Sequence, residues 1–273
     1  AMQSIAHGAD YVSFFRWRTA TMGTEIYWHG ILDYDNRDNR KLAEVHRIWN
    51  RTKAISEIAG ADYQSAFAMV RDYDNIWDSQ VDVWHSRLAK KSEKEIFVAS
   101  QINHTPMDVV YLLDSTEAEE LLKYPVLIYP HALILTEKRA ELLKVYVEAG
   151  GCLIIGSRTG QKEINGKCVM TPMPGLLSNV SASDVKEFTF VGPADDTVTM
   201  KWNEKEIDTG LFNDILVTTS LEAKILAKYE NNYYEGRPAL VETPCGKGKV
   251  LHFGGTFTRE NVKELLSYTG VLE

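Results

Sequence analysis

The sequence predicts an α/β fold over residues 61–273, with a mostly parallel sheet that carries helices on both faces. Short apolar runs such as VLIY at 126–129 alternate with longer segments of helical periodicity. A repeated order of strand and helix is typical of right-handed crossovers and parallel pairing. Because the apolar runs are nearly continuous rather than alternating, we expect these strands to be buried on both faces.

The first 60 residues have a different pattern. ADYVSFFRWR, residues 9–18, is rich in β-branched and aromatic residues and predicts a buried strand. Residues 39–58 then place apolar side chains at helical spacing, and Gly60 suits a C-terminal cap. We therefore expect one strand and one helix in residues 1–60, ahead of the α/β domain.

Within residues 61–273 the expected elements follow one another along the chain. In the first half we expect strands at 66–70, 108–112, 126–129 and 153–156, and helices at 86–103, 115–123 and 137–149. The rhythm then weakens into shorter strands, at 186–190, 197–202, 223–229, 238–244 and 248–255. The turn PCGKGK joins the last two, and a helix over 259–269 closes the chain.

Composition excludes several classes of function. The net charge of −8 and a pI of about 5.5, without a basic cluster, argue against a nucleic-acid or anionic-membrane partner. Cys152, Cys168 and Cys245 are too few and too scattered for a disulfide framework or a zinc site. No apolar run is long enough to span a membrane, and the N-terminus lacks the pattern of a signal peptide. We expect a cytoplasmic protein without a metal or cofactor.

Several short motifs suggest chemistry but favour simpler interpretations. DYDN, which begins at Asp33 and again at Asp72, does not continue as a calcium loop and indicates a loop or a strand-end turn. Cys152 precedes an apolar run, which indicates a buried structural thiol. GKGK at Gly246 lacks the phosphate-loop spacing and predicts a β-turn. His131 follows a parallel strand without a placed nucleophile or acid, which favours a structural histidine.

The stretch SFFRWRTATMGTEIYWHG, residues 13–30, is a stronger candidate for a binding site. In a (β/α)8 barrel, residues after a strand lie at the carboxyl-end rim, where active sites are built. An indole face suits the apolar face of a sugar ring, and a carboxylate accepts hydrogen bonds from two vicinal hydroxyls. An aromatic core strand with surface arginines is an equally good interpretation on composition alone. The candidate residues are Arg16, Arg18, Glu25, Trp28 and His29.

AHGADYVSFFRWRTATMGTEIYWHGILDYDNRDNR resembles the segment around the eighth barrel strand of beta-galactosidases of glycoside hydrolase family forty-two. The resemblance continues through VRDYDNIWD, PMDVV, KYPVLIYPHALILTEKRAELLKVYVEAGGCLIIGSRTG, PMPGLL and YYEGRPALVETPCGKGKVLHFGG, which are similar to the family's middle domain. It implies that residues 1–60 are the end of an incomplete TIM barrel. It also implies that residues 61–273 are a flavodoxin-like or amidotransferase-like trimerisation domain.

The resemblance also implies a function. Enzymes of this family are retaining beta-galactosidases that use one glutamate as acid/base and a second as nucleophile. Both glutamates are expected before residue 1, so the chain contains no catalytic residue and is expected to be inactive alone. Its implied partners are two further copies of itself, in a homotrimer, and a galactoside substrate only in the full-length enzyme.

The roles implied for the candidate residues are few. Glu25 matches a glutamate that hydrogen-bonds galactose hydroxyls in the sugar subsite. Many members have a histidine three residues later, where this chain has Trp28 followed by His29. Arg16 and Arg18 match the strand-end arginines of the family, for which ion pairing and substrate contact are both open.

Two other functions remain open from the sequence. One is a self-contained amidotransferase-like domain that binds a small ligand at the carboxyl edge of its sheet, near His131, Ser157 and Arg158. A self-contained domain of that kind would not require the stretch SFFRWR or Glu25, which precede it in the chain. The other is a sugar-binding module without chemistry, for which Glu25 ordered on bound galactose would be the evidence.

Overall fold

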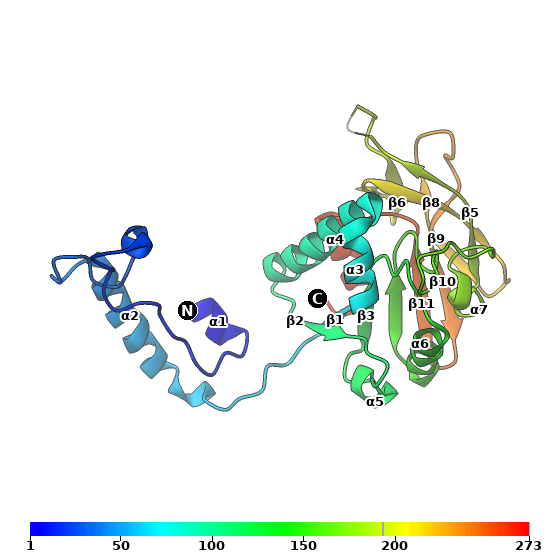
Figure 1. Ribbon diagram of the computed structural model, residues 1–273. Coiled ribbons are helices and arrows are strands. Elements are labelled where there is room, and N and C mark those ends of the chain that lie inside the picture. The colour runs from blue at the N-terminus through cyan, green and yellow to red at the C-terminus, as the bar shows by residue number, and fades with distance from the viewer. Residues whose placement is uncertain (193, 273) are drawn as a thin grey trace. The chain divides into compact units, whose positions relative to one another are not determined.

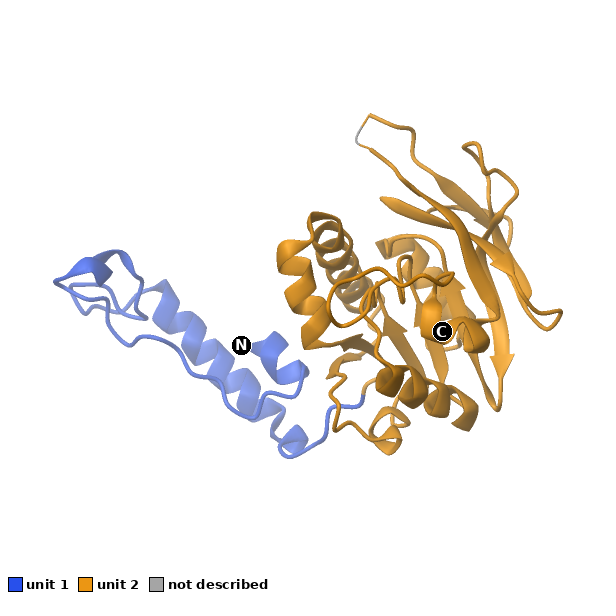
Figure 2. Cartoon of the chain, turned by 45° about the vertical axis from the view of Figure 1, so that its right-hand side comes forward, with its two compact units in different colours: residues 1–64 blue, residues 65–273 orange. Residues whose placement is uncertain are grey.

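The computed structural model describes residues 1–192 and 194–272. The chain forms two compact units, residues 1–64 and residues 65–273, coloured separately in Figure 2. Each unit has its own secondary structure and is described by itself. Among the described residues, every helix is too short or too polar to cross a membrane.

The first unit contains mainly one helix, α2 (Arg40–Ala54), followed by the 3-10 turn η2 (Ser56–Ile58). Asn39 caps α2, because its side chain accepts a hydrogen bond from the backbone N–H of Leu42 at 3.0 Å. The helix expected over 39–58 is therefore confirmed, with its last turn tightened. The unit also contains the short helices α1 (Met2–Ala6) and η1 (Thr24–Tyr27).

The strand expected over residues 9–18 is wrong. Only Arg18 has a strand-like partner, in an isolated parallel bridge with Leu32. Residues 31–32 donate hydrogen bonds only to the last residues of the segment 9–18. The Ile31 N–H donates to the Arg16 carbonyl at 2.8 Å, and the Leu32 N–H donates to the Trp17 carbonyl at 2.7 Å. A strand requires a neighbour along its length for its backbone groups, and the described part of the unit supplies none to residues 10–15. Phe15 and Trp17 are consequently 79% and 61% exposed.

The second unit is built on a nine-stranded sheet in the order β2-β1-β3-β4-β11-β10-β9-β6-β7 (Figure 1). Its strands are β1 (Phe67–Arg71), β2 (Met107–Tyr111), β3 (Val126–Tyr129), β4 (Cys152–Ile155), β6 (Thr199–Trp202), β7 (Lys205–Asp208), β9 (Lys224–Tyr229), β10 (Pro238–Cys245) and β11 (Gly248–Phe253). A separate antiparallel pair contains β5 (Ser183–Phe190) and β8 (Phe212–Thr218).

The strands β2, β1, β3, β4 and β11 pair in parallel, and the rest of the sheet pairs antiparallel. The predicted α/β class is therefore confirmed, with an antiparallel half that extends the parallel one. β10 and β11 form the expected hairpin, and Gly246 in its turn has a φ of +59°, a left-handed value that glycine adopts without strain. The turn expected at GKGK is confirmed.

Helices cover both faces of the parallel strands, which accounts for the apolar character of those strands. β1 alternates between two cores: Phe67 and Met69 pack in one, and Ala68 and Val70 in the other. The first core includes side chains of α4 (Val83–Ile102) and α8 (Arg259–Tyr268). The second includes side chains of α6 (Glu137–Ala149) and of the short helices α5 (Ala118–Leu121) and α7 (Ser178–Ser181), the last of which follows the 3-10 turn η3 (Gly175–Leu177).

The expected helix over 137–149 is confirmed at both ends, whereas α3 (Tyr73–Val81) was not predicted. Asp72 directly follows β1 and caps α3, since its side chain accepts from the Asn75 N–H at 2.9 Å. The second DYDN is thus a strand-end turn that begins a helix.

Candidate functional site

In the first unit, the structure brings Arg16 and Glu25 together. The Arg16 Nη1 donates to Glu25 Oε2 at 2.7 Å, and the Arg16 Nε donates to the Arg18 carbonyl at 3.2 Å. These two bonds fix the Arg16 guanidinium between the Arg18 carbonyl and the Glu25 carboxylate. The Arg16 side chain is 24% exposed and that of Glu25 is 55% exposed. The Glu25 carboxylate therefore lies at the surface of the unit, with its orientation fixed by Arg16.

The other predicted site residues lie near this pair but do not join it. Trp28 ends η1 and is 68% exposed, and its backbone N–H donates to the Glu25 carbonyl at 3.0 Å. His29 follows it and is exposed. The Arg18 side chain makes no hydrogen bond or ion pair among the described residues, and only its backbone is bridged to Leu32.

The turn behind these residues is tightly packed. The Gly30 N–H donates to Thr19 Oγ1 at 2.8 Å, and Thr19 Oγ1 donates to the Leu32 carbonyl at 3.1 Å. A side chain at Gly30 would overlap the backbone of Arg18 and Thr19. Only glycine therefore allows this close approach of the two segments.

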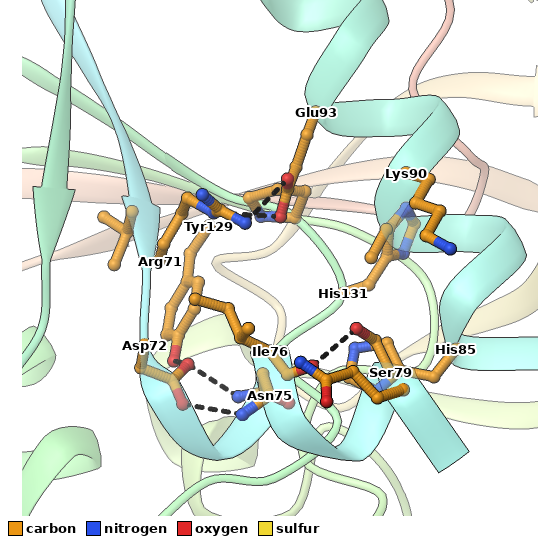
Figure 3. Close-up of a pocket in the computed structure, with 14 residues that line it drawn as sticks. Arg71, Asp72, Asn75, Ile76, Ser79, His85, Lys90, Glu93, Tyr129 and His131 are labelled. Atoms are coloured by element: carbon orange, nitrogen blue, oxygen red, sulfur yellow. Dashed lines mark hydrogen bonds and ion pairs between the residues drawn. The ribbon is translucent and has the colours of Figure 1, made fainter. Parts of the chain in front are cut away.

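In the second unit, polar groups gather at the carboxyl ends of β1 and β3 (Figure 3). Asp72 lies at the centre and is 1% exposed. It accepts hydrogen bonds from the Asn75 N–H and side-chain amide, from the Tyr129 hydroxyl and from the Arg139 guanidinium at 3.2 Å. Burial and the neighbouring Asp72 carboxylate both raise the pKa of Tyr129, so that its hydroxyl stays protonated and donates.

His131, expected to be structural, is fully buried and hydrogen-bonded at both ring nitrogens. Its Nδ1 lies 2.8 Å from the Ser157 carbonyl, which only accepts, so Nδ1 carries the proton. Its Nε2 therefore accepts from Ser92 Oγ at 2.7 Å, and that hydroxyl in turn accepts from the Phe257 N–H at 3.2 Å. Burial lowers the pKa of His131 to about 4, which keeps the ring neutral. The structural interpretation of His131 is confirmed.

A third cluster of polar side chains links α3, α4 and the loop after β4. The Lys162 ammonium donates to both oxygens of Asp78, at 2.9 and 2.8 Å, and to Asp82 at 2.7 Å. His85 Nδ1 lies 2.7 Å from the same Asp78 carboxylate. Burial lowers the pKa of His85 in spite of Asp78, so the ring is neutral with its proton on Nδ1.

Cys152 is not placed as a nucleophile. It is the first residue of β4 and is 7% exposed, and burial raises the pKa of its thiol to about 12. A thiol with that pKa is not a nucleophile at neutral pH. The Arg158 N–H, another part of the expected ligand site, donates instead to the buried Asp214 carboxylate at 2.7 Å. The described residues contain no group of three or more side chains suited to a metal ion.

Sequence reasoning missed Asp72, Tyr129, Arg139 and the group around His85. The partners of Asp72 come from positions up to 67 residues away along the chain, and spacing alone carries no signal for such contacts. A signal was present only for the cap, where Asp72 stands three residues before Asn75 at the start of a helix.

Family models of known proteins match segments of both units. A family model described as the beta-galactosidase trimerisation domain matches residues 65–270, and one described as beta-galactosidase matches residues 1–55. Among curated proteins, beta-galactosidase BgaA of Clostridium cellulovorans is 30% identical over 98% of this chain and 40% of its own length. Beta-galactosidase LacZ of Heyndrickxia coagulans is 27% identical over 97% of this chain and 39% of its own length.

A solved structure shares the fold. The catalytic mutant of Gan42B, a GH42 beta-galactosidase from G. stearothermophilus, aligns with a TM-score of 0.87 at 21% identity, over 98% of this chain and 38% of that one. The chain thus spans about two fifths of the length of the relatives that it matches. Through the match over residues 65–270, the chain belongs to the family of the beta-galactosidase trimerisation domain.

Proposed function

We propose that this chain is part of a retaining beta-galactosidase that hydrolyses terminal beta-D-galactosides, and that it contributes the trimerisation domain and one wall of the sugar site. The support is the match of both units to beta-galactosidase models and relatives, in one continuous stretch of chain. On this proposal, residues 1–60 close a barrel whose two catalytic glutamates lie on earlier strands. The chain alone then has no hydrolytic activity. The comparisons do not favour a self-contained ligand-binding domain.

In this function Glu25 accepts hydrogen bonds from two galactose hydroxyls, and Arg16 positions its carboxylate. The 2.7 Å ion pair supports this assignment, since it holds the carboxylate in one direction while leaving it 55% exposed. Trp28 and His29 are proposed to lie beside the sugar, because both are exposed and follow Glu25 directly. Arg18 is proposed as a further contact from the end of the bridged segment.

We expect Glu25→Gln, made in the complete enzyme, to lower kcat/KM for a nitrophenyl galactoside by roughly ten- to a hundredfold. The amide cannot accept from two hydroxyls as a carboxylate does, and hydrogen bonds to charged groups contribute about 1.5–3 kcal/mol. Glu44→Gln is the matched control, since Glu44 pairs with Arg40 on the surface of α2. Equal kcat/KM for the two variants would remove Glu25 from the sugar site.

The proposed assembly is a homotrimer in the cytoplasm, and the second unit offers a surface for it. Tyr111, Tyr73 and Trp77 form an aromatic surface, with neighbouring ring centroids 5.3 and 5.7 Å apart. They are 38%, 48% and 60% exposed, and Val81 continues the same stripe of α3 at 82%. β2, which carries Tyr111, is an edge strand of the sheet. Exposed aromatic patches of this kind are typical of protein interfaces.

The proposed compartment and fold type have separate support. Three free cysteines support a reducing compartment. The order of the five parallel strands supports a flavodoxin-like description of the unit.

We expect Trp77→Glu to convert the trimer into monomers at micromolar concentration, because it places a charge on the most exposed ring of the aromatic surface. The fold should survive, since the side chain is more than half exposed. Leu221→Glu is the control: this side chain is fully exposed and lies outside any strand or helix. Light scattering coupled to size exclusion measures both masses. A trimeric Trp77→Glu variant would place the interface elsewhere.

A further inference from the structure

The second unit has a cavity of about 200 Å³ at the carboxyl ends of β1 and β3. These two strands adjoin in the sheet, but the chain leaves β1 toward β2 on one side and reaches β3 on the other. The strand order therefore reverses at this point, and open α/β sheets bind ligands at such a reversal. All the residues that line the cavity come from positions 70–131, so the second unit builds it without the first.

The floor of the cavity is built from polar side chains that are hydrogen-bonded to one another. Asp72 is surrounded by donors from Asn75, Tyr129 and Arg139. Both ring nitrogens of His131 are occupied by Ser157 and Ser92. Groups that are satisfied by one another hold a cavity open rather than collapse into it, because moving any of them would leave a buried polar atom without a partner.

Two groups on the walls remain able to bind. His85 is only 1% exposed, its Nδ1 is taken by Asp78, and its Nε2 has no hydrogen-bond partner among the described residues. Because the proton is on Nδ1, Nε2 is an acceptor. Across the cavity, Arg71 and Glu93 form an ion pair with an Nη2 to Oε2 distance of 3.2 Å, and their side chains are 29% and 27% exposed. In Figure 3 this pair, His85 and His131 surround one space.

The charge around the cavity indicates the chemistry of a ligand. Arg71 and Glu93 form one ion pair, Arg139 pairs with both Asp72 and Asp74, and the His85 ring is neutral. Lys90 alone carries an unpaired charge among the lining residues, and it is exposed at the rim. A charged ligand would lose its hydration without meeting an opposite charge at depth. A neutral ligand with several hydroxyls would donate to Glu93 and His85 and accept from Arg71.

We propose that this cavity binds a small neutral polyol or a single sugar ring, with adjacent hydroxyls on Glu93 and Arg71 and another on His85 Nε2. Ile76 and Ala89, which also line the cavity, face its carbon atoms. The volume of about 200 Å³ is below the roughly 300–1,000 Å³ typical of pockets for drug-sized ligands, which suits one ring but not an oligosaccharide. This site lies in the second unit and is independent of the proposed galactosidase function.

The test is calorimetric titration of the 273-residue chain with glycerol, myo-inositol and galactose, and with sodium acetate and inorganic phosphate for comparison. We expect inositol or galactose to bind in the millimolar range. We expect Glu93→Gln to weaken that binding by about tenfold or more, because a charged acceptor for two hydroxyls is lost. Glu95→Gln is the matched control, as Glu95 lies on the same helix and pairs with Arg259 at 3.1 Å but does not line the cavity.

Each outcome decides the proposal. Polyol binding that Glu93→Gln weakens and Glu95→Gln preserves supports it. It is overturned by no binding, by tighter binding of acetate or phosphate, or by galactose binding that Glu25→Gln abolishes and Glu93→Gln leaves unchanged. That last result would place the sugar on the first unit and would leave the proposed galactosidase function intact. Circular dichroism of the variants verifies that each is folded.

Discussion

Replacement of Asp72 by alanine is expected to lower the free energy of unfolding of the second unit by about 3–5 kcal/mol. Asp72 is buried and connects four elements, because it directly follows β1, caps α3, and accepts from Tyr129 at the end of β3 and from Arg139 on α6. Its removal leaves the Arg139 guanidinium and the Tyr129 hydroxyl buried with fewer partners. That is more costly than the loss of the bonds themselves.

Urea unfolding followed by circular dichroism measures this change. Glu44→Ala is the control, since it breaks an exposed pair between positions four residues apart on α2 and is expected to cost no more than about 0.5 kcal/mol. A loss below about 1 kcal/mol for Asp72→Ala would show that Asp74, which also pairs with Arg139, holds the guanidinium by itself.

Asp214→Asn is expected to stabilise the protein increasingly as the pH rises. Asp214 is fully buried, its Oδ2 accepts the Arg158 N–H at 2.7 Å, and its Oδ1 has no partner among the described residues. The Arg158 guanidinium does not reach the carboxylate and lies over the Phe188 and Phe212 rings, at 4.4 and 4.8 Å. Burial, only partly opposed by Arg158, raises the pKa of Asp214 to about 7.

The direction of the effect follows from the raised pKa. Between the ordinary value of 3.8 and about 7, the native state keeps a proton that the unfolded state has released, so stability falls as the pH rises through this window. The gap of about three pH units corresponds to a loss of about 4 kcal/mol above it. Asparagine does not titrate, and its side-chain oxygen still accepts from Arg158.

Urea unfolding of both proteins at about pH 5 and about pH 8 tests this result. The stability difference between variant and parent is expected to grow by about 3 kcal/mol between these two values. The comparison across pH cancels the constant cost of fitting the new amide group into the site. A difference that stays constant would mean that Asp214 is ionised throughout or has a partner in solution.

Local patterns predicted the strands and helices whose environment is set by nearby residues. β3 and α6 were placed at their observed ends, because four apolar residues buried on both faces and a threonine-capped helix closed by Gly150 are signals within a short stretch. α3 escaped prediction because Asn75 is its only buried residue, and its aromatic stripe is exposed. The apolar side chains that repeat at helical spacing along α3 therefore face away from the core.

Contacts between distant segments could not be predicted. The segment 9–18 has the composition of a strand, but composition does not supply the neighbour that a strand needs. Within the described part of the unit, only Ile31 and Leu32 pair with its end. Arg16 and Glu25 were singled out as separate candidates, and their pairing across nine positions became visible only in the structure. The cavity depends on the meeting of β1, β3 and α4, which is a property of the sheet order rather than of any motif.

We have proposed that this chain carries a domain that assembles three copies of itself. The decisive measurement is its native mass, by light scattering coupled to size exclusion over a range of concentrations. We expect a species of three times the chain mass of 30.9 kDa. A single species of 30.9 kDa at every concentration would contradict it.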